Sequence, residues 1–297
     1  MILGLSILFS PLYCQLIGEK LPAYNSLTQI VADSSEVLHA NLRQQELYSV
    51  PFELQGTENI AVLNLMKNRI VSLPNWFCGL SKLRELNLKQ NGLETVPDCF
   101  GDLQELEHLK LEKNSLDSEQ INKLQGLARL EHLYLSKNKL QSWPEAMGKL
   151  ENLRILYLDH NALTQLDAKA FSVEAKLEIV NLSVNALEAV PASLLESKHL
   201  GNLNLSKNQL KSLPAINKEQ HALRVLDLSY NQLQTLPDLS KLHQLSILSL
   251  SFNELSTVLE QVKTLKQLKH LYLVGNEISE TEIVAIKKAL PDCKVWI

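Results

Sequence analysis

The sequence predicts an α/β repeat solenoid, with about eleven short parallel β-strands stacked along one side and return segments along the other. Three observations predict this class. Sixty-three of the 297 residues are Leu, far above ordinary usage. An eleven-residue pattern recurs ten times at spacings of 22 to 24 residues, and seven of the ten prolines follow it at one fixed offset. Self-similarity at a fixed period indicates stacked structural repeats.

The repeated pattern reads apolar, two free, apolar, one free, apolar, two free, Asn, one free, apolar. Its ten copies run from IAVLNLMKNRI to LKHLYLVGNEI, and a degenerate eleventh copy, VLHANLRQQEL, precedes them with Gln45 in place of Asn. The fixed asparagines are Asn68, Asn91, Asn114, Asn138, Asn161, Asn185, Asn208, Asn231, Asn253 and Asn276.

The alternation of apolar residues in the centre of each copy predicts a strand. One coil cannot bury its own leucines, but stacked coils share a continuous Leu core. The asparagine amide suits the point where a strand ends, because it offers two donors and an acceptor to unpaired backbone groups. Proline lies six residues further on, and because it cannot join a hydrogen-bonded ladder, that point belongs to the return path.

The pattern LxxLxLxxNxL resembles the leucine-rich repeat family. The 23-residue period and the proline are similar to its short class, found in bacterial and Ras-suppressor-like members. The resemblance implies a horseshoe whose parallel sheet lines the concave side and whose convex side is irregular or helical. It also implies a protein-binding function, since members of this family bind protein partners.

The N-terminal residues 1–36 are expected to form an extension and a helical cap. Residues 1–14 are nearly all apolar, a run too short to span a bilayer and interrupted by Pro11. The first basic residue is Lys20, whereas a signal peptide carries one before its apolar stretch. Two interpretations stay open, a cleaved signal peptide and an apolar segment folded onto the first coil.

Residues 37–278 hold the repeats, and residues 279–297 are expected to close the solenoid. Ser279 and Glu282 form a capping-box pattern that opens an amphipathic helix. Pro291 ends this helix, and the last residues are expected to add a short strand. Such caps hide the final core layer, which a solenoid needs at each end.

The composition argues against several function classes. With 29 Lys and Arg against 33 Asp and Glu, the chain lacks the basic excess of a nucleic-acid binder. No phosphate-binding loop, nucleophile elbow, HExxH or paired CxxC occurs, so we expect no enzymatic activity and no cofactor. Cys78 and Cys99 lie on neighbouring return segments, two positions away from equivalence. Two interpretations stay open, a close approach of the two residues and free buried thiols, and we expect the thiols.

The outward residues of the strands supply the candidate partner-binding site. Tyr is scarce in this chain, and two Tyr residues stand at equivalent places on neighbouring strands beside His and aliphatic residues, a typical interface mixture. A second group of aromatic residues follows near the C-terminus. The candidates are His108, Lys110, His132, Tyr134, Ile155, Tyr157, Asp159, His160, Ile179, Tyr230, Phe252, His270 and Tyr272.

Chemistry at these positions is the weaker hypothesis. His108 and His132 occupy equivalent places, but a metal site needs a third ligand and Lys110 is unfavourable. A hydrolase using His132, Asp159 and His160 has no obvious nucleophile.

The sequence therefore predicts a monomeric protein without a membrane span that binds a host or bacterial protein. The resemblance suggests a bacterial effector that acts in the host cytosol and inhibits or regulates an enzyme. The alternative is an exported recognition protein of the envelope or extracellular space.

Overall fold

The computed structural model describes residues 23–168, 171 and 175–297. They form two compact units that divide between Tyr157 and Leu158. The apolar stretch at residues 1–14, and with it the choice between a signal peptide and a folded segment, lies outside the described residues.

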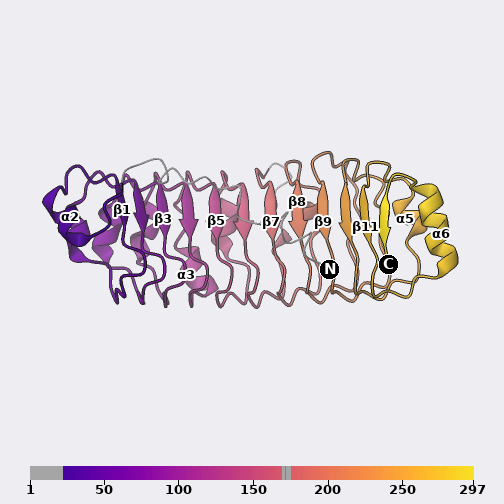
Figure 1. Ribbon diagram of the computed structural model, residues 1–297, viewed down its shortest axis with the longest axis horizontal. Coiled ribbons are helices and arrows are strands. Elements are labelled where there is room, and N and C mark those ends of the chain that lie inside the picture. Colours follow the sequence, from indigo (N-terminus) through magenta and orange to yellow (C-terminus); the bar gives the residue numbers. More distant parts are fainter. Residues whose placement is uncertain (1–22, 169–170, 172–174) are drawn as a thin grey trace. The chain divides into compact units, whose positions relative to one another are not determined.

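The first unit contains six parallel strands that pair in chain order (Figure 1). A short helix, α2 (Leu27–Ala32), precedes them; its N-terminus is capped by the Ser26 side chain, and its Ile30 is fully buried. The strands are β1 (His39–Asn41), β2 (Val62–Asn64), β3 (Glu85–Asn87), β4 (His108–Lys110), β5 (His132–Tyr134) and β6 (Ile155–Tyr157).

The return segments of the first unit carry single helical turns. Four are 3₁₀ helices that begin directly after a proline, whose fixed φ suits the start of a helix. They are η3 (Phe52–Gly56), η4 (Asn75–Gly79), η5 (Asp98–Asp102) and η6 (Glu145–Lys149), and the fifth turn is the α-helix α3 (Ser118–Asn122).

The second unit repeats this plan with six more parallel strands in chain order. They are β7 (Ile179–Asn181), β8 (Asn202–Asn204), β9 (Val225–Asp227), β10 (Ile247–Ser249), β11 (His270–Tyr272) and β12 (Lys294–Trp296). Its helices are α4 (Ala192–Leu195), α5 (Leu259–Val262) and α6 (Glu280–Ala289). The two units thus hold eleven repeat strands and one closing strand, which confirms the predicted repeat fold.

The C-terminal cap differs from the predicted capping box in one contact. Ser279 accepts a hydrogen bond from the Glu282 amide, as expected. The Glu282 carboxylate instead accepts from the amides of Val258 and Leu259 in the coil before it, at 2.9 and 2.8 Å. Glu282 therefore also connects α6 to the preceding repeat.

The repeated asparagines form a ladder along each unit. The Asn208 amide nitrogen donates to the carbonyl oxygens of Leu182 and Leu205, both at 3.0 Å, and its oxygen accepts from the Leu187 amide at 3.0 Å. The side chain thus uses two donors and an acceptor on backbone groups, as the sequence predicted, and it also links its own coil to the coil before it. Asn208 is only 8% exposed, so these bonds lie in a dry environment where unpaired backbone groups are costly.

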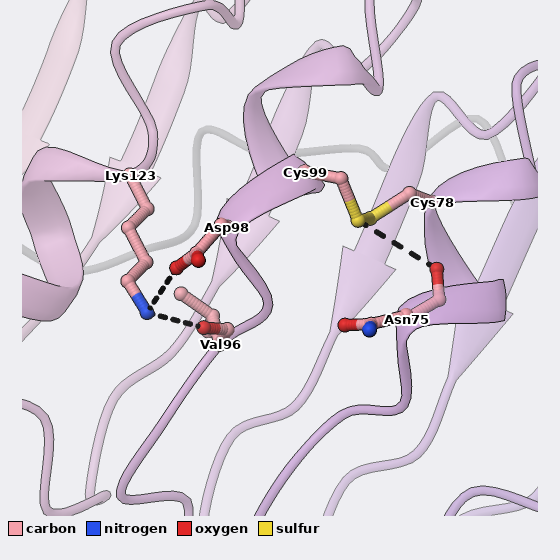
Figure 2. The surroundings of a disulfide bond; sticks show 6 residues. All are labelled: Asn75, Cys78, Val96, Asp98, Cys99 and Lys123. Atoms are coloured by element: carbon pink, nitrogen blue, oxygen red, sulfur yellow. Dashed lines mark hydrogen bonds and ion pairs between the residues drawn. A yellow bond between two sulfur atoms is a disulfide. The ribbon is translucent and has the colours of Figure 1, made fainter.

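The expectation of free buried thiols at Cys78 and Cys99 is wrong. The two residues are half-buried and form a disulfide, with Cα atoms 6.0 Å apart (Figure 2). They lie on η4 and η5, which belong to neighbouring coils. A 3₁₀ helix rises about 2 Å per residue, so an offset of two positions corresponds to about 4 Å along the turn, and the observed Cα distance still lies within disulfide range.

We predict that Asn208→Ala destabilises the protein by about 3 kcal/mol, because three buried backbone groups lose their partner at about 1 kcal/mol each. Urea unfolding followed by circular dichroism measures the change. Asn202→Ala, on the half-buried outer side of β8, is the control and should cost no more than about 0.5 kcal/mol. Equal effects of the two substitutions would contradict the ladder's role.

Candidate binding face

Each three-residue strand points its middle residue into the core and its first and third residues outward, as strand alternation requires. In β4, for example, Leu109 is fully buried, whereas His108 and Lys110 are half-buried. We call the surface made by the outward strand residues of a unit, together with the turn residues that directly follow each strand, its strand face. Nine of the thirteen predicted site residues are first or third residues of strands, and the other four, Asp159, His160, Tyr230 and Phe252, lie two or three residues after a strand ends.

Two histidines pack against each other on the strand face of the first unit. The register of β4 and β5 pairs His108 with His132, and their ring centroids lie 4.3 Å apart. Burial lowers the pKa of both imidazoles, that of His132 to about 4, and the neighbouring His108 adds to the effect. Both rings are therefore neutral at pH 7 and act as packing groups.

The predicted tyrosine pair lies next to these histidines. The rings of Tyr134 and Tyr157 are 5.3 Å apart and tilted, and the Lys110 ammonium lies 5.7 Å from the Tyr134 ring centre. The two tyrosines are only 4% and 8% exposed, and Ile155 beside them is 8% exposed. The pair is therefore mostly packed within the face, with little surface left for a partner.

A pocket of about 250 Å³ opens on the strand face of the first unit, over β1 to β4, and sequence reasoning did not anticipate it. It combines a buried carboxylate, Glu85, with cationic and amide groups. The only sign of this pocket in the sequence was Glu85, an acidic residue at the position that the aliphatic Val62 holds in the strand before it. The polar residues that line the pocket are His39, Asn41, Arg43, Asn64, Glu85, Asn87, His108 and Lys110.

Three more candidates belong to the second unit. His160 Nδ1 lies 2.9 Å from a carboxylate oxygen of Asp159, and the Asn181 amide donates to the other oxygen at 3.2 Å. Ile179 begins β7 and is half-buried. The hydrolase hypothesis combined His132 with Asp159 and His160. His132 lies in the first unit, whereas Asp159 and His160 lie together in the second.

The second unit carries a row of aromatic side chains. Tyr230 and Phe252 stack with centroids 4.4 Å apart, and Tyr272 stacks on Trp296 at 5.7 Å. The ring centroids of His270 and Tyr272 lie 6.3 Å apart. Phe252 is 38% exposed and the other three aromatic rings are half-buried. We call Tyr230, Phe252, Tyr272 and Trp296 the aromatic row.

Cations flank this row on both sides. The Lys207 ammonium lies 5.4 Å from the Tyr230 ring centre, and Lys294 lies 4.1 Å from that of Trp296. Trp296 was absent from the sequence candidates, although the register that pairs β11 with β12 places it beside Tyr272. Continuing the outward alternation into the closing strand would have identified it.

A left-handed backbone position explains how Phe252 reaches its place. The residue before each repeated asparagine has a positive φ, which is 56° at both Tyr230 and Phe252. In the next repeat Gly275 occupies this position, with φ 72°. A Cβ atom on Gly275 would lie 2.6 Å from the Phe252 ring, so glycine there leaves the space that the ring fills.

We predict that the His132 imidazole titrates with a midpoint near pH 4, which ¹H–¹³C NMR of the ring measures. Because folding favours the neutral ring, the unfolded chain binds the proton more readily. This residue's contribution to stability is therefore complete above pH 6.5 and is lost as the pH falls towards 4. A midpoint at the ordinary value near 6.5 would contradict the packed arrangement.

Comparison with known proteins agrees with the repeat fold. The family model described as leucine rich repeat matches residues 53–93, 94–140, 119–163 and 151–210, and a model of two leucine rich repeats matches residues 221–263. No curated protein matches the sequence significantly.

Solved structures share the fold at low identity. An internalin from Listeria monocytogenes is 19% identical with a TM-score of 0.69, over 93% of this chain and 84% of that chain. The Drosophila Toll–Spatzle complex is 23% identical with a TM-score of 0.74, over 92% of this chain and 37% of that chain. A Leptospira interrogans leucine-rich repeat protein is 22% identical with a TM-score of 0.50, over 93% of this chain and 100% of that chain. The matched models cover more than half of the sequence, and the chain belongs to the leucine-rich repeat family.

Proposed function

We propose that this chain is a non-catalytic protein-binding module that holds its partner on the strand face, with the aromatic row of the second unit as principal anchor. The repeat fold is that of a protein–protein interaction module. One observation supports the choice of anchor: Phe252 is 38% exposed, whereas Tyr134 and Tyr157 are nearly buried.

The aromatic row has the chemistry of an interface hot spot. Its rings are held in stacks, so that little side-chain entropy is lost on binding. Tyr and Trp combine an apolar body with a polar end, which is why both are enriched among the residues that dominate binding energy. Lys207 and Lys294 beside the row favour a partner that presents apolar side chains next to carboxylates.

The strand face of the first unit is proposed as a secondary contact. His108, Lys110, His132, Tyr134 and Tyr157 form a packed surface there. Since the tyrosine rings are already buried against their neighbours, they contribute shape and hydroxyl groups more than new apolar contact area.

Four further candidate residues lie on the second unit. Asp159 and His160 would add polar contacts, and Ile179 and His270 would add contact area. In the Drosophila structure Toll is in complex with Spatzle, which supports a protein partner for a chain of this fold. That the partner is an enzyme regulated by a bacterial effector remains a hypothesis from the sequence.

We predict that Phe252→Ala and Tyr272→Ala each weaken partner binding by about 2 kcal/mol, close to thirtyfold in Kd. Affinity enrichment from host-cell and bacterial lysates identifies proteins bound by the wild-type chain, and titration calorimetry then compares the variants. Tyr48→Ala, an exposed aromatic residue outside the strands, is the control and should bind like wild type.

Tyr134→Phe combined with Tyr157→Phe keeps the packed rings and removes only the hydroxyl groups, so it tests the first unit without creating a cavity. We expect it to weaken binding less than Phe252→Ala does. A partner held equally by the wild type, by Phe252→Ala and by Tyr272→Ala would contradict the proposal.

We further propose that the protein works in an oxidising compartment, after export to the envelope or the extracellular space. The Cys78–Cys99 disulfide supports this location over the host cytosol, because cytosolic thiols are kept reduced. The disulfide closes a loop across a sequence separation of 21 residues, for which loop entropy corresponds to about 3 kcal/mol.

We predict that Cys78 and Cys99 of protein taken directly from its native compartment resist alkylation until a reductant is added. Mass spectrometry of the alkylated peptides measures this, and the unpaired, half-buried Cys293 is the internal control after unfolding. Full alkylation of Cys78 and Cys99 without reductant would place the working protein in a reducing compartment.

A further inference from the structure

A cluster of two histidines and one glutamate lies outside the strand face, in the segments that lead into β9 and β10. One ligand atom from each of Glu219, His221 and His243 can be chosen so that all three lie within 4.8 Å of one another. All three residues are exposed. In the sequence, only His108 and His132 stood out as a possible pair of metal ligands, and this group was missed.

The backbone brings the three side chains together. Gln220 and Leu242 form a parallel bridge, in which the Gln220 amide donates to the Lys241 carbonyl oxygen at 3.0 Å and the His243 amide donates to the Gln220 carbonyl oxygen at 3.2 Å. Gln220 and Leu242 are buried. Since neighbouring residues of an extended segment point to opposite sides, Glu219, His221 and His243 face solvent together.

Gln220 fixes this segment to the core of the second unit. Its side-chain amide donates to the carbonyl oxygens of Ser197 and Leu200, at 2.7 and 3.2 Å, and accepts from the amides of Ala222 and Leu223. Gln220 is 1% exposed. A saturated, buried anchor between two of the candidate ligands holds their backbones in a fixed register.

The side chains already converge. The rings of His221 and His243 stack with centroids 4.9 Å apart, and His243 Nε2 is in close contact with a carboxylate oxygen of Glu219. This contact lowers the pKa of Glu219, so the carboxylate is charged at pH 7. Lys241 lies 3.7 Å from the other carboxylate oxygen and opposes a cation there, but only one oxygen is needed as a ligand.

We propose that Glu219, His221 and His243 bind a divalent transition-metal ion of the zinc type, with water completing the coordination. Imidazole nitrogen and carboxylate oxygen bind zinc at 2.0 to 2.2 Å, and three such ligands plus water are typical of an open zinc site. Tetrahedral geometry separates ligand atoms by about 3.4 Å at those bond lengths. Rotation of the exposed side chains closes the remaining gap.

The only described thiol without a disulfide does not compete for this role. Burial raises the pKa of Cys293 to about 11, so its sulfur is protonated at pH 7 and is a poor zinc ligand. The proposal does not depend on the partner-binding function, because none of the three ligands belongs to the strand face.

Isothermal titration of the full chain with Zn²⁺ tests this proposal. We expect one saturable site in the wild type, with affinity reduced about tenfold or more in Glu219→Gln, His221→Ala and His243→Ala, since even lost outer contacts of a metal site cost that much. His199→Ala, which removes another exposed histidine of the same unit, should bind like wild type. Mg²⁺ should not bind, because it prefers oxygen ligands.

A second readout separates binding from folding. Zn²⁺ should raise the Tm of the wild type and of His199→Ala, because a ligand that binds only the folded chain stabilises it, and should leave the Tm of His243→Ala unchanged. Wild-type affinity in both His221→Ala and His243→Ala would overturn the proposal, as would a wild-type chain that shows no saturable zinc site.

Discussion

The structure depends on one repeated interaction, the hydrogen bonding of a buried asparagine amide to backbone groups of its own coil and of the coil before it. Leucine burial drives the coils together, but it is non-directional and does not set their register. The asparagine supplies that direction. Asn208, for example, joins carbonyl groups that lie 23 residues apart in the chain, at Leu182 and Leu205. The parallel strands follow from this spacing.

The same turn shapes the surface that we propose for binding. The chain adopts a left-handed conformation just before each asparagine, which costs about 1 kcal/mol or more for residues other than glycine. This conformation occurs at His160, Tyr230 and Phe252, which are all candidate contacts. The hydrogen bonds of the asparagine thus offset the free-energy cost of the left-handed turn. The side chain at the turn remains available for contacts with a partner.

Much of the fold could be predicted from the sequence, because a period of 23 residues determines which residues are neighbours. The strands and the outward positions follow from that period, and the capping helix follows from the pattern of Ser279 and Glu282. The solvent exposure of the outward side chains could not be predicted in this way. Tyr134 belonged to the first group of candidates and Phe252 to the second, yet Tyr134 is packed between side chains and Phe252 is exposed to solvent. This difference depends on the sizes and rotamers of their neighbours.

The missed features arise where the period does not apply. The disulfide joins Cys78 and Cys99, which are two positions out of phase. The zinc candidate combines His243 with residues 219–221, in segments that lie outside the eleven-residue pattern. In both cases the pairing of irregular segments on neighbouring coils decides which side chains meet, and this pairing becomes visible only in three dimensions.

Site-specific photo-crosslinking tests the central claim, partner binding on the strand face, most directly. A photoreactive amino acid replaces Phe252 in one sample and Val284, an exposed residue of α6, in another. Each sample is irradiated with the partner recovered by affinity enrichment. The account predicts a covalent complex from position 252 and little from position 284. Crosslinking from position 284 alone would place the partner outside the strand face and contradict the account.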